Sequence, residues 1–318
     1  MSNKRFLKKF NSQSDYESQK DSVMGIPHVV LFEDTKELLY ASESETPSVD
    51  YSKEYFTIEA LEDDTNITFF INSFTDNTCN IYYSINGNDF KKIVLEDYNN
   101  DGVININDIN YYSSHGLILN KNDKMRIKID NTVFFKNKED IDENDEIIFI
   151  KCNIFGETSS IINTNKKFNC YGNIMSLLYG DNFTNNNFQE LMEYTTIFYR
   201  LFYKTMVVNA KYLILPNFIT EGCYSNMFYG CTSLTTAPEL PVTTLASGCY
   251  GNMFRNCTNL NNITMLATDI SASNCFSNWV NGVSSSGTFI KNKDLDISLL
   301  PNGVSGIPNG WAVEDYKE

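Results

Sequence analysis

CYSNMFYGCTSL at residues 223–234 and CYGNMFRNCTNL at residues 249–260 are nearly the same twelve residues, written twice at an interval of 26 positions. Each copy carries two cysteines, and Cys275 opens a third, more divergent copy at the same interval. One unit of this length cannot bury its own apolar face, whereas stacked units each supply the wall that the neighbour lacks. The interval therefore predicts a solenoid, and it lies in the length range of leucine-rich repeats.

Within one unit, the sequence predicts a short extended stretch and a short helix. SLTTAPEL at 233–240 is typical of the extended part, and Ser247–Asn256 is the candidate helix. Four residues with offsets of 0, 4, 5 and 8 would then share one helical face: Cys249, Met253, Phe254 and Cys257. Phenylalanine returns at the same interval of 26: Phe202, Phe228 and Phe254. We therefore expect Cys and Phe to occupy inward positions in coil after coil.

The repeated cysteines are interpreted as packing residues. A buried thiol behaves as a small apolar side chain, so we expect columns of stacked thiols. Disulfides between coils are geometrically conceivable, but the packing does not need them. Zinc has little support, because a spacing of eight is not C-x-x-C and the polar neighbours are Asn and Thr rather than His.

The chain as a whole is expected to be multidomain and α+β. Residues 1–50 form the candidate attachment or oligomerisation segment, 51–165 a small β-sandwich and 166–318 the solenoid with a C-terminal cap. In the first segment, a capping box at Ser14–Glu17 predicts a short helix, and His28–Phe32 with Glu37–Tyr40 predicts a hairpin.

The middle segment is rich in strand patterns. Asn86-Gly87 is a strong type I′ hairpin turn between two apolar runs. Met125–Ile129 alternates apolar and charged residues, as a half-buried strand does. Six or more such runs separated by polar turns favour a small β-sandwich.

One loop in this segment has the ligand pattern of a calcium site. Calcium binds six to eight oxygens, and a twelve-residue loop supplies them at positions 1, 3, 5, 7, 9 and 12, with glycine at position 6. Gly102 is that glycine. The six candidate ligands are Asp97, Asn99, Asp101, Val103 through its carbonyl, Asn105 through a water, and Asp108. The alternative is a chance match in an Asn- and Asp-rich turn. The loop resembles the dockerin type, but it occurs once and follows a strand pattern.

Composition narrows the classes of partner. The net charge of −15 disfavours nucleic acid as a partner. No apolar run reaches the length of a membrane span, and the N-terminal stretch MSNKRFLKKFNSQSDY lacks the apolar core of a secretory signal. Its four basic residues, Lys4, Arg5, Lys8 and Lys9, form either an arm that docks on an acidic partner or a solvated terminus.

The repeat blocks resemble the BspA-like leucine-rich repeat, and SGIPNGWAVEDY at 305–316 resembles the closing segment of such proteins. CYGNIMSLLYGDNF at 170–183 is similar to the entry into their repeats, and YYSINGNDFKKI at 82–93 to the β-module that often precedes them. RFLKKFNSQSDYESQKDSVMGIPHVVLFEDTKELLYA at 5–41 resembles the start of structural proteins from crAss-like and related phages of gut Bacteroidales.

The resemblance implies a virion structural protein, a head fibre, capsid decoration or tail fibre component that is made in the host cytoplasm and released by lysis. Its expected partners are other virion proteins through the N-terminal segment, further copies of itself, and a cell-surface glycan or protein. The alternative is a bacterial surface adhesin, but we expect such a protein to carry an export signal. Tyr224, Tyr229 and Tyr250 are candidate glycan contacts if their rings are exposed.

An enzyme is not expected. The two histidines, His28 and His115, lie in different regions, and neither is near a nucleophile motif such as G-x-S-x-G. Paired carboxylates leave no mark in a linear sequence, so an enzyme that degrades surface polysaccharide remains a third alternative.

The calcium hypothesis predicts a metal-dependent stability. Replacing Asp97 and Asp101 with Ala removes two of the charged ligands, so the thermal midpoint should fall when calcium is present and should not change when it is chelated. Thermal unfolding of the parent and the double variant, with calcium and with chelator, measures both effects. A parent protein whose midpoint ignores calcium would contradict the hypothesis.

Overall fold

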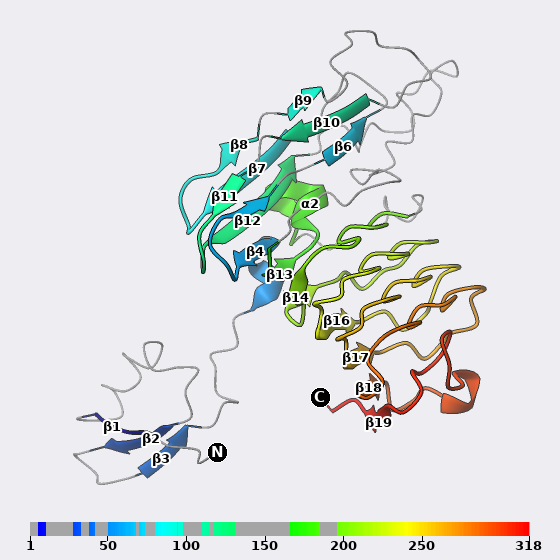
Figure 1. Cartoon of the computed structure of the whole chain (residues 1–318). Helices are drawn as coiled ribbons and strands as arrows, with labels where there is room; N and C mark the ends of the chain where they lie inside the picture. The colour runs from blue at the N-terminus through cyan, green and yellow to red at the C-terminus, as the bar shows by residue number, and fades with distance from the viewer. Residues whose placement is uncertain are drawn as a thin grey trace. The chain divides into compact units, whose positions relative to one another are not determined.

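The fold is taken from a computed structural model of the chain (Figure 1). It describes residues 6–10, 28–32, 38–41, 50–67, 70–73, 80–93, 95–97, 110–114, 117–130, 166–184 and 196–317. The chain divides into two compact units, 1–50 and 51–318. The described residues are mostly β, with a C-terminal β-solenoid of about four coils and very little helix. The expected α+β class is therefore wrong in its helical part.

The first unit contains one three-stranded sheet. Its strands are β1 (Phe6–Phe10), β2 (His28–Phe32) and β3 (Leu38–Ala41). β2 and β3 pair antiparallel, which confirms the expected hairpin, and β1 pairs parallel with β2. The helix predicted from the capping box lies outside the described residues.

Three sheets lie within the described residues of the second unit. The smallest joins β5 (Thr65–Ile67) to β11 (Leu117–Leu119). Another has the order β6-β10-β9, with β6 at Phe70–Ser73, β10 at Asn110–Ser114 and β9 at Leu95–Asp97. The third has eleven strands and runs from the cap of the solenoid into the segment before it.

The segment before the solenoid contributes four strands to the large sheet. They are β4 (Thr57–Ala60), β7 (Asn80–Ile85), β8 (Lys91–Lys92) and β12 (Lys124–Asp130). Asn86 and Gly87 have φ values of 52° and 82°, as a type I′ turn requires, and the N–H of Asn88 donates to the carbonyl of Ile85. β12 buries Met125, Ile127 and Ile129, so its alternation is confirmed. The β-sandwich itself stays a prediction.

One strand, β13 (Phe168–Asn173), joins this segment to the solenoid. On one side it pairs antiparallel with β4, and on the other it pairs parallel with β14 (Val207–Asn209) and β15 (Leu213–Ile214). Because one sheet passes through the expected boundary near residue 165, the two parts share backbone hydrogen bonds and belong to one compact unit.

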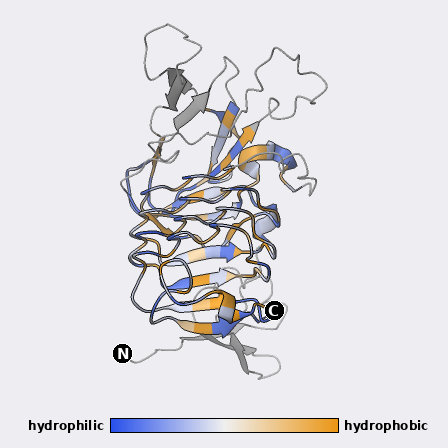
Figure 2. Ribbon diagram, turned by 90° about the vertical axis from the view of Figure 1, so that its right-hand side faces the viewer, coloured by the Kyte–Doolittle hydropathy of each residue, from blue (hydrophilic) through white to orange (hydrophobic). Residues whose placement is uncertain are grey.

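The solenoid stacks its coils through parallel strands. They follow one another as β14, β16 (Thr236–Leu240), β17 (Asn262–Met265), β18 (Thr288–Lys291) and β19 (Ala312–Asp315). Figure 2 shows these coils one above another. Apart from the strands, the second unit has short helical turns: η2 (Tyr51–Lys53), α2 (Ser176–Tyr179), η4 (Gly180–Asn182) and η6 (Ile297–Leu299).

The helix expected around Ser247–Asn256 is not present, and a run of turns takes its place. Every fourth residue has a positive φ, which no α-helix allows: Gly248 at 62°, Asn252 at 52° and Asn256 at 63°. The two residues after Gly248 and the two after Asn252 point inward, as does Cys257 after Asn256. A four-residue turn repeat therefore buries the same offsets of 4, 5 and 8 that a helix would bury, and all four predicted inward residues are fully buried: Cys249, Met253, Phe254 and Cys257.

These turns satisfy the backbone in two alternating ways. The N–H of Met227 donates within its own turn, to the carbonyl of Tyr224 at 3.1 Å. The next N–H, of Phe228, donates to the following coil, to the carbonyl of Met253 at 3.0 Å. The same alternation holds along residues 222–231, where the bonds to the next coil always span 25 positions. The turn face thus needs neither a helix nor a sheet to pair its N–H groups.

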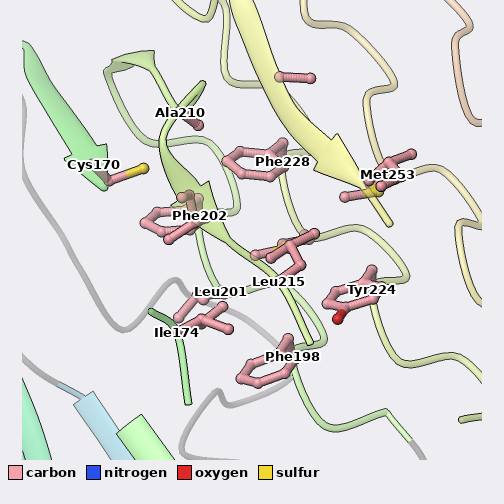
Figure 3. Close-up of a cluster of buried hydrophobic side chains, with 14 of the residues drawn as sticks. Cys170, Ile174, Phe198, Leu201, Phe202, Ala210, Leu215, Tyr224, Phe228 and Met253 are labelled. Atoms are coloured by element: carbon pink, nitrogen blue, oxygen red, sulfur yellow. The ribbon is translucent and has the colours of Figure 1, made fainter. Parts of the chain in front are cut away.

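Aromatic columns fill the interior behind the turns. Phe202 stacks on Phe228 with ring centroids 5.0 Å apart, and Phe228 stacks on Phe254 at 5.7 Å. A second column starts with Phe198 on Tyr224 at 5.7 Å, and Figure 3 shows this pair and the Phe202–Phe228 pair. Stacked aromatic pairs contribute about 0.5–1.5 kcal/mol beyond the area that they bury.

The last coil closes the stack with polar groups. Leu240 of β16 and Met265 of β17 occupy the same register position in adjacent strands. In β18 and β19 this position is held by Lys291 and Asp315, and their side chains form an ion pair at 2.7 Å. The indole N–H of Trp279 donates to the carbonyl of Gly306 in the cap at 2.7 Å. A polar outer end is what a solenoid requires to stay soluble.

The turn repeat predicts opposite effects for two small substitutions at one position. Asn226 has a φ of 57°, so Asn226→Ala should destabilise the chain by about 1–2 kcal/mol, because a Cβ without a local hydrogen bond is disfavoured there. Asn226→Gly should cost less than about 0.5 kcal/mol. Denaturant unfolding of both variants measures the difference, and equal losses would contradict the assigned backbone.

Candidate functional site

The candidate calcium loop begins at the end of β9 and precedes β10 in the three-stranded sheet β6-β10-β9. Asp97 is the last residue of β9, where it pairs with Tyr112 of β10. The loop therefore joins two antiparallel strands, which agrees with an insertion in a β-module. The other candidate ligands lie outside the described residues: Asn99, Asp101, Val103, Asn105 and Asp108. Calcium binding stays a prediction.

Within the described parts of the chain, no group of three or more His, Cys, Asp or Glu side chains is placed to hold a metal ion. Over the same residues, no helix is long and apolar enough to cross a bilayer. His28 lies in β2, and His115 is outside the described residues.

Two of the three tyrosines expected as glycan contacts are in the core. Tyr224 and Tyr250 are fully buried and stack on each other with centroids 6.0 Å apart, so their assignment as surface contacts is wrong. They follow the αL residue of the turn repeat by two positions, and that position points inward. Tyr229 occupies the outward position and remains partly exposed. Burial raises the pKa of both core tyrosines well above the ordinary value.

The cysteines form the expected inward columns. Six free thiols of the described residues are buried: Cys170, Cys223, Cys231, Cys249, Cys257 and Cys275. The thiol of Cys231 donates to the carbonyl of Phe202 at 2.8 Å, and the thiol of Cys257 to that of Phe228 at 3.0 Å. Burial raises the pKa of Cys231 to about 12, from an ordinary value of 9.0. Such thiols are poor nucleophiles, because only the thiolate reacts.

A polar cluster locks the entry of the solenoid to the preceding strands. Lys128 of β12 forms an ion pair with Asp181 of η4 at 2.7 Å, and the hydroxyl of Tyr55 donates to the same carboxylate at 2.7 Å. The hydrogen bond from Lys128, then that from Tyr55, lowers the pKa of Asp181. Ser176 adds a buried bridge, since its hydroxyl accepts from the N–H of Phe56 and donates to the carbonyl of Ile127, both at 2.9 Å.

The outward positions of the turns carry a second set of aromatic residues together with cations. We call it the turn-face ladder, and it consists of Tyr199, Arg200, Tyr203, Lys204, Tyr229 and Arg255. Tyr203 stacks on Tyr229 in the next coil with centroids 5.0 Å apart, and Arg255 of the third coil lies over Tyr229 at 5.9 Å.

The first coil adds two cations to the ladder. The guanidinium of Arg200 lies between two rings, 5.0 Å from the centroid of Tyr199 and 4.8 Å from that of Tyr203. The ammonium of Lys204 lies 5.1 Å from the ring of Tyr203. Lys204 is exposed, and the other members are partly exposed. Cation–π contacts at such sites contribute about 0.5–1 kcal/mol each.

Sequence reasoning found only Tyr229 of this ladder. A signal for the others was present, because Tyr203, Tyr229 and Arg255 lie at the repeat interval of 26. The first coil has Ile197 and Thr205 at the positions of the repeated cysteines, so the cysteine interval does not align its outward residues with those of the next coils.

Comparison with known proteins adds no identification: no family model, curated protein or solved structure matches the chain.

The buried thiols predict a loss of stability at high pH. Unfolded thiols release their protons near pH 9, whereas folded Cys223, Cys231 and Cys249 keep theirs until about pH 12. Raising the pH through this window therefore favours the unfolded state, by up to about 1.4 kcal/mol per pH unit for each thiol. Denaturant unfolding between pH 8 and about pH 11 gives the slope.

Cys231→Val isolates one thiol, since Val283 holds the same position two coils later. The variant should lose stability less steeply with pH than the parent by about 1.4 kcal/mol per unit. Equal slopes would show that this thiol is not buried in the folded protein.

Proposed function

We propose that the chain is a virion structural protein of a phage, a head fibre, capsid decoration or tail fibre component that displays a BspA-like leucine-rich-repeat solenoid for surface attachment. The support is the resemblance of the repeat blocks, the closing segment and the N-terminal stretch to such proteins. The observation that carries the proposal is the stack of coils with a side-chain-filled interior. A stack of this kind is a rigid support for surface residues.

The rigidity extends into the segment before the solenoid. The eleven-stranded sheet joins the first coil to the preceding strands through β13, and the cluster of Lys128, Asp181 and Tyr55 holds η4 against β12. Backbone hydrogen bonds and an ion pair thus fix the orientation of the solenoid relative to the strands that precede it. This property fits a protein that presents a binding surface at a distance from its attachment point.

The proposal assigns a role to each part of the chain. Residues 1–50, which form a compact unit of their own, attach the protein to other virion proteins. Residues 51–165 form a small β-sandwich-like module with a structural calcium ion at the loop that begins with Asp97. Several copies assemble together, because proteins on symmetric particles are usually oligomeric.

A bacterial surface adhesin of the same repeat family is the second candidate. It is favoured by the same solenoid, since a rigid repeat surface serves an adhesin equally well. The two functions differ in where the protein is found, so location rather than fold separates them.

The location test is mass spectrometry of purified particles from a lysate of the producing host. Peptides from residues 1–50 and from the solenoid should be abundant in particles and should persist after a high-salt wash. A truncated chain lacking residues 1–50 should no longer join the particles. Peptides recovered only from the bacterial cell surface would favour the adhesin and overturn the virion role.

A further inference from the structure

The turn-face ladder combines cationic and aromatic side chains at outward positions, where packing of the core does not require them. We propose that it binds an anionic glycan, with Arg200, Lys204 and Arg255 holding the acidic groups and the exposed edges of the tyrosines contacting the sugar rings. The role of this glycan as a surface receptor rests on the attachment function proposed above. Binding of the glycan does not rest on it and can be measured with the purified chain alone.

Among the described residues, the cations of the ladder have no acidic partner. No described carboxylate lies within 4.0 Å of Arg200, Lys204 or Arg255. Over the same described residues, the Nε atoms of both arginines are buried and have no hydrogen-bond partner, so an external anion would meet the terminal nitrogens of each guanidinium. Arg255 makes one side-chain hydrogen bond, at 3.3 Å to the amide oxygen of Asn252. The charges are therefore available to an external anion.

The first coil has neither Asn nor Gly at its αL positions, which hold Thr196, Arg200 and Lys204, and two of these three residues are cations of the ladder. At the second and third αL positions of the turn repeat, the later coils have Asn or Gly: Asn226, Gly230, Asn252, Asn256, Asn278 and Gly282. The first coil has Arg200 and Lys204 there, with φ values of 59° and 58°. A long side chain is disfavoured in this conformation. Strain of this kind concentrates at ligand sites, because folding alone gains nothing from it.

Both cations are held in place before any ligand arrives. Their backbones belong to the bonds between coils, with the N–H of Lys204 donating to the carbonyl of Tyr229 at 2.7 Å. The stem of Lys204 lies over Gly230, where a Cβ would come within 2.9 Å of its Cγ. The guanidinium of Arg200 lies over the rings of Tyr199 and Tyr203, at 5.0 and 4.8 Å from their centroids. A guanidinium can bind a carboxylate through two parallel N–H groups.

The dimensions of the ladder fit a linear polymer. Arg255 lies two coils beyond Arg200 and Lys204, which is about 10 Å at the usual spacing of adjacent strands. An anionic glycan that runs along the stack would place successive acidic groups against these two sets of cations. Tyrosine supplies the rigid amphipathic surface that such a ligand needs between its charges.

Other anionic partners fit less well. A stable protein partner covers roughly 20–30 residues on each side, and the ladder has six. A nucleic acid is held through many phosphate contacts, and the long-range field of a chain with a net charge of −15 repels it. A few ion pairs combined with ring packing suffice for a glycan.

Binding is measured by biolayer interferometry with the full chain against four immobilised polymers at 150 mM salt, a concentration at which the Debye length is about 8 Å. The polymers are polygalacturonate, heparin, neutral dextran and polyglutamate. Binding to polygalacturonate or heparin, and not to dextran or polyglutamate, supports the proposal and identifies the acidic group as carboxylate or sulfate. Equal binding to polyglutamate, equal binding to dextran, or no binding to any polymer would overturn it.

The variants separate binding from folding. Arg200→Asn and Lys204→Gly introduce the residues found at the same positions of later coils, so the thermal midpoint should stay the same or rise while glycan affinity falls at least tenfold. Thr196→Gly is the matched control, since Thr196 has a φ of 56° and carries no charge. It relieves the same strain and should leave binding unchanged. Retained affinity in the double variant would also overturn the proposal.

Virion location and glycan binding can fail independently. A chain that binds the glycan but is absent from particles loses the virion role and keeps this site. A chain that is abundant in particles but binds none of the four polymers loses the site and keeps the virion role.

Discussion

The solenoid depends on one constraint: each coil of the turn face must offer its carbonyls to the coil before it at a constant offset of 25 residues. Half of the N–H groups are used inside the turns, and the other half exist only as bonds between coils. An insertion of one residue in a turn would leave several of these groups unpaired at once, and each buried unpaired group costs about 1–3 kcal/mol. The repeat length is therefore fixed by the backbone before any side chain is chosen.

Side chains then follow from the four-residue rhythm of the turns. In the first two turns of a coil, the residue with positive φ is Gly or Asn in most coils, the next two fill the core, and the fourth faces outward. Because equivalent positions lie above one another, aromatic rings form columns inside and a second column outside, as Phe228 and Tyr229 illustrate. The four-residue turn repeat thus determines which residues lie in the core and which lie on the surface. A change of residue type at an outward position therefore alters the surface without disturbing the stack.

The sequence was sufficient for the features that depend on interval alone. Cys249 and Phe254 were placed inward correctly, because their spacing is buried by a helix and by four-residue turns alike. The same ambiguity produced the wrong helix, since periods of 3.6 and 4 cannot be separated over nine residues, and only the positive φ of Asn252 decides between them. The pairing of β13 with β4 joins residues more than 100 positions apart, and no local pattern encodes it. The cations of the ladder were missed because their coil lacks the cysteines that mark the repeat.

The closing strand has a consequence for growth of the sheet. All four residues of β19 are exposed, and it lies at the end of the eleven-stranded order. An open strand of this kind invites another chain to add to it, which would extend the stack into a fibril. Glu314 places a negative charge on that strand, and Asp315 forms an ion pair with Lys291 at 2.7 Å. Charged side chains therefore line the open edge, and such side chains disfavour the addition of another strand.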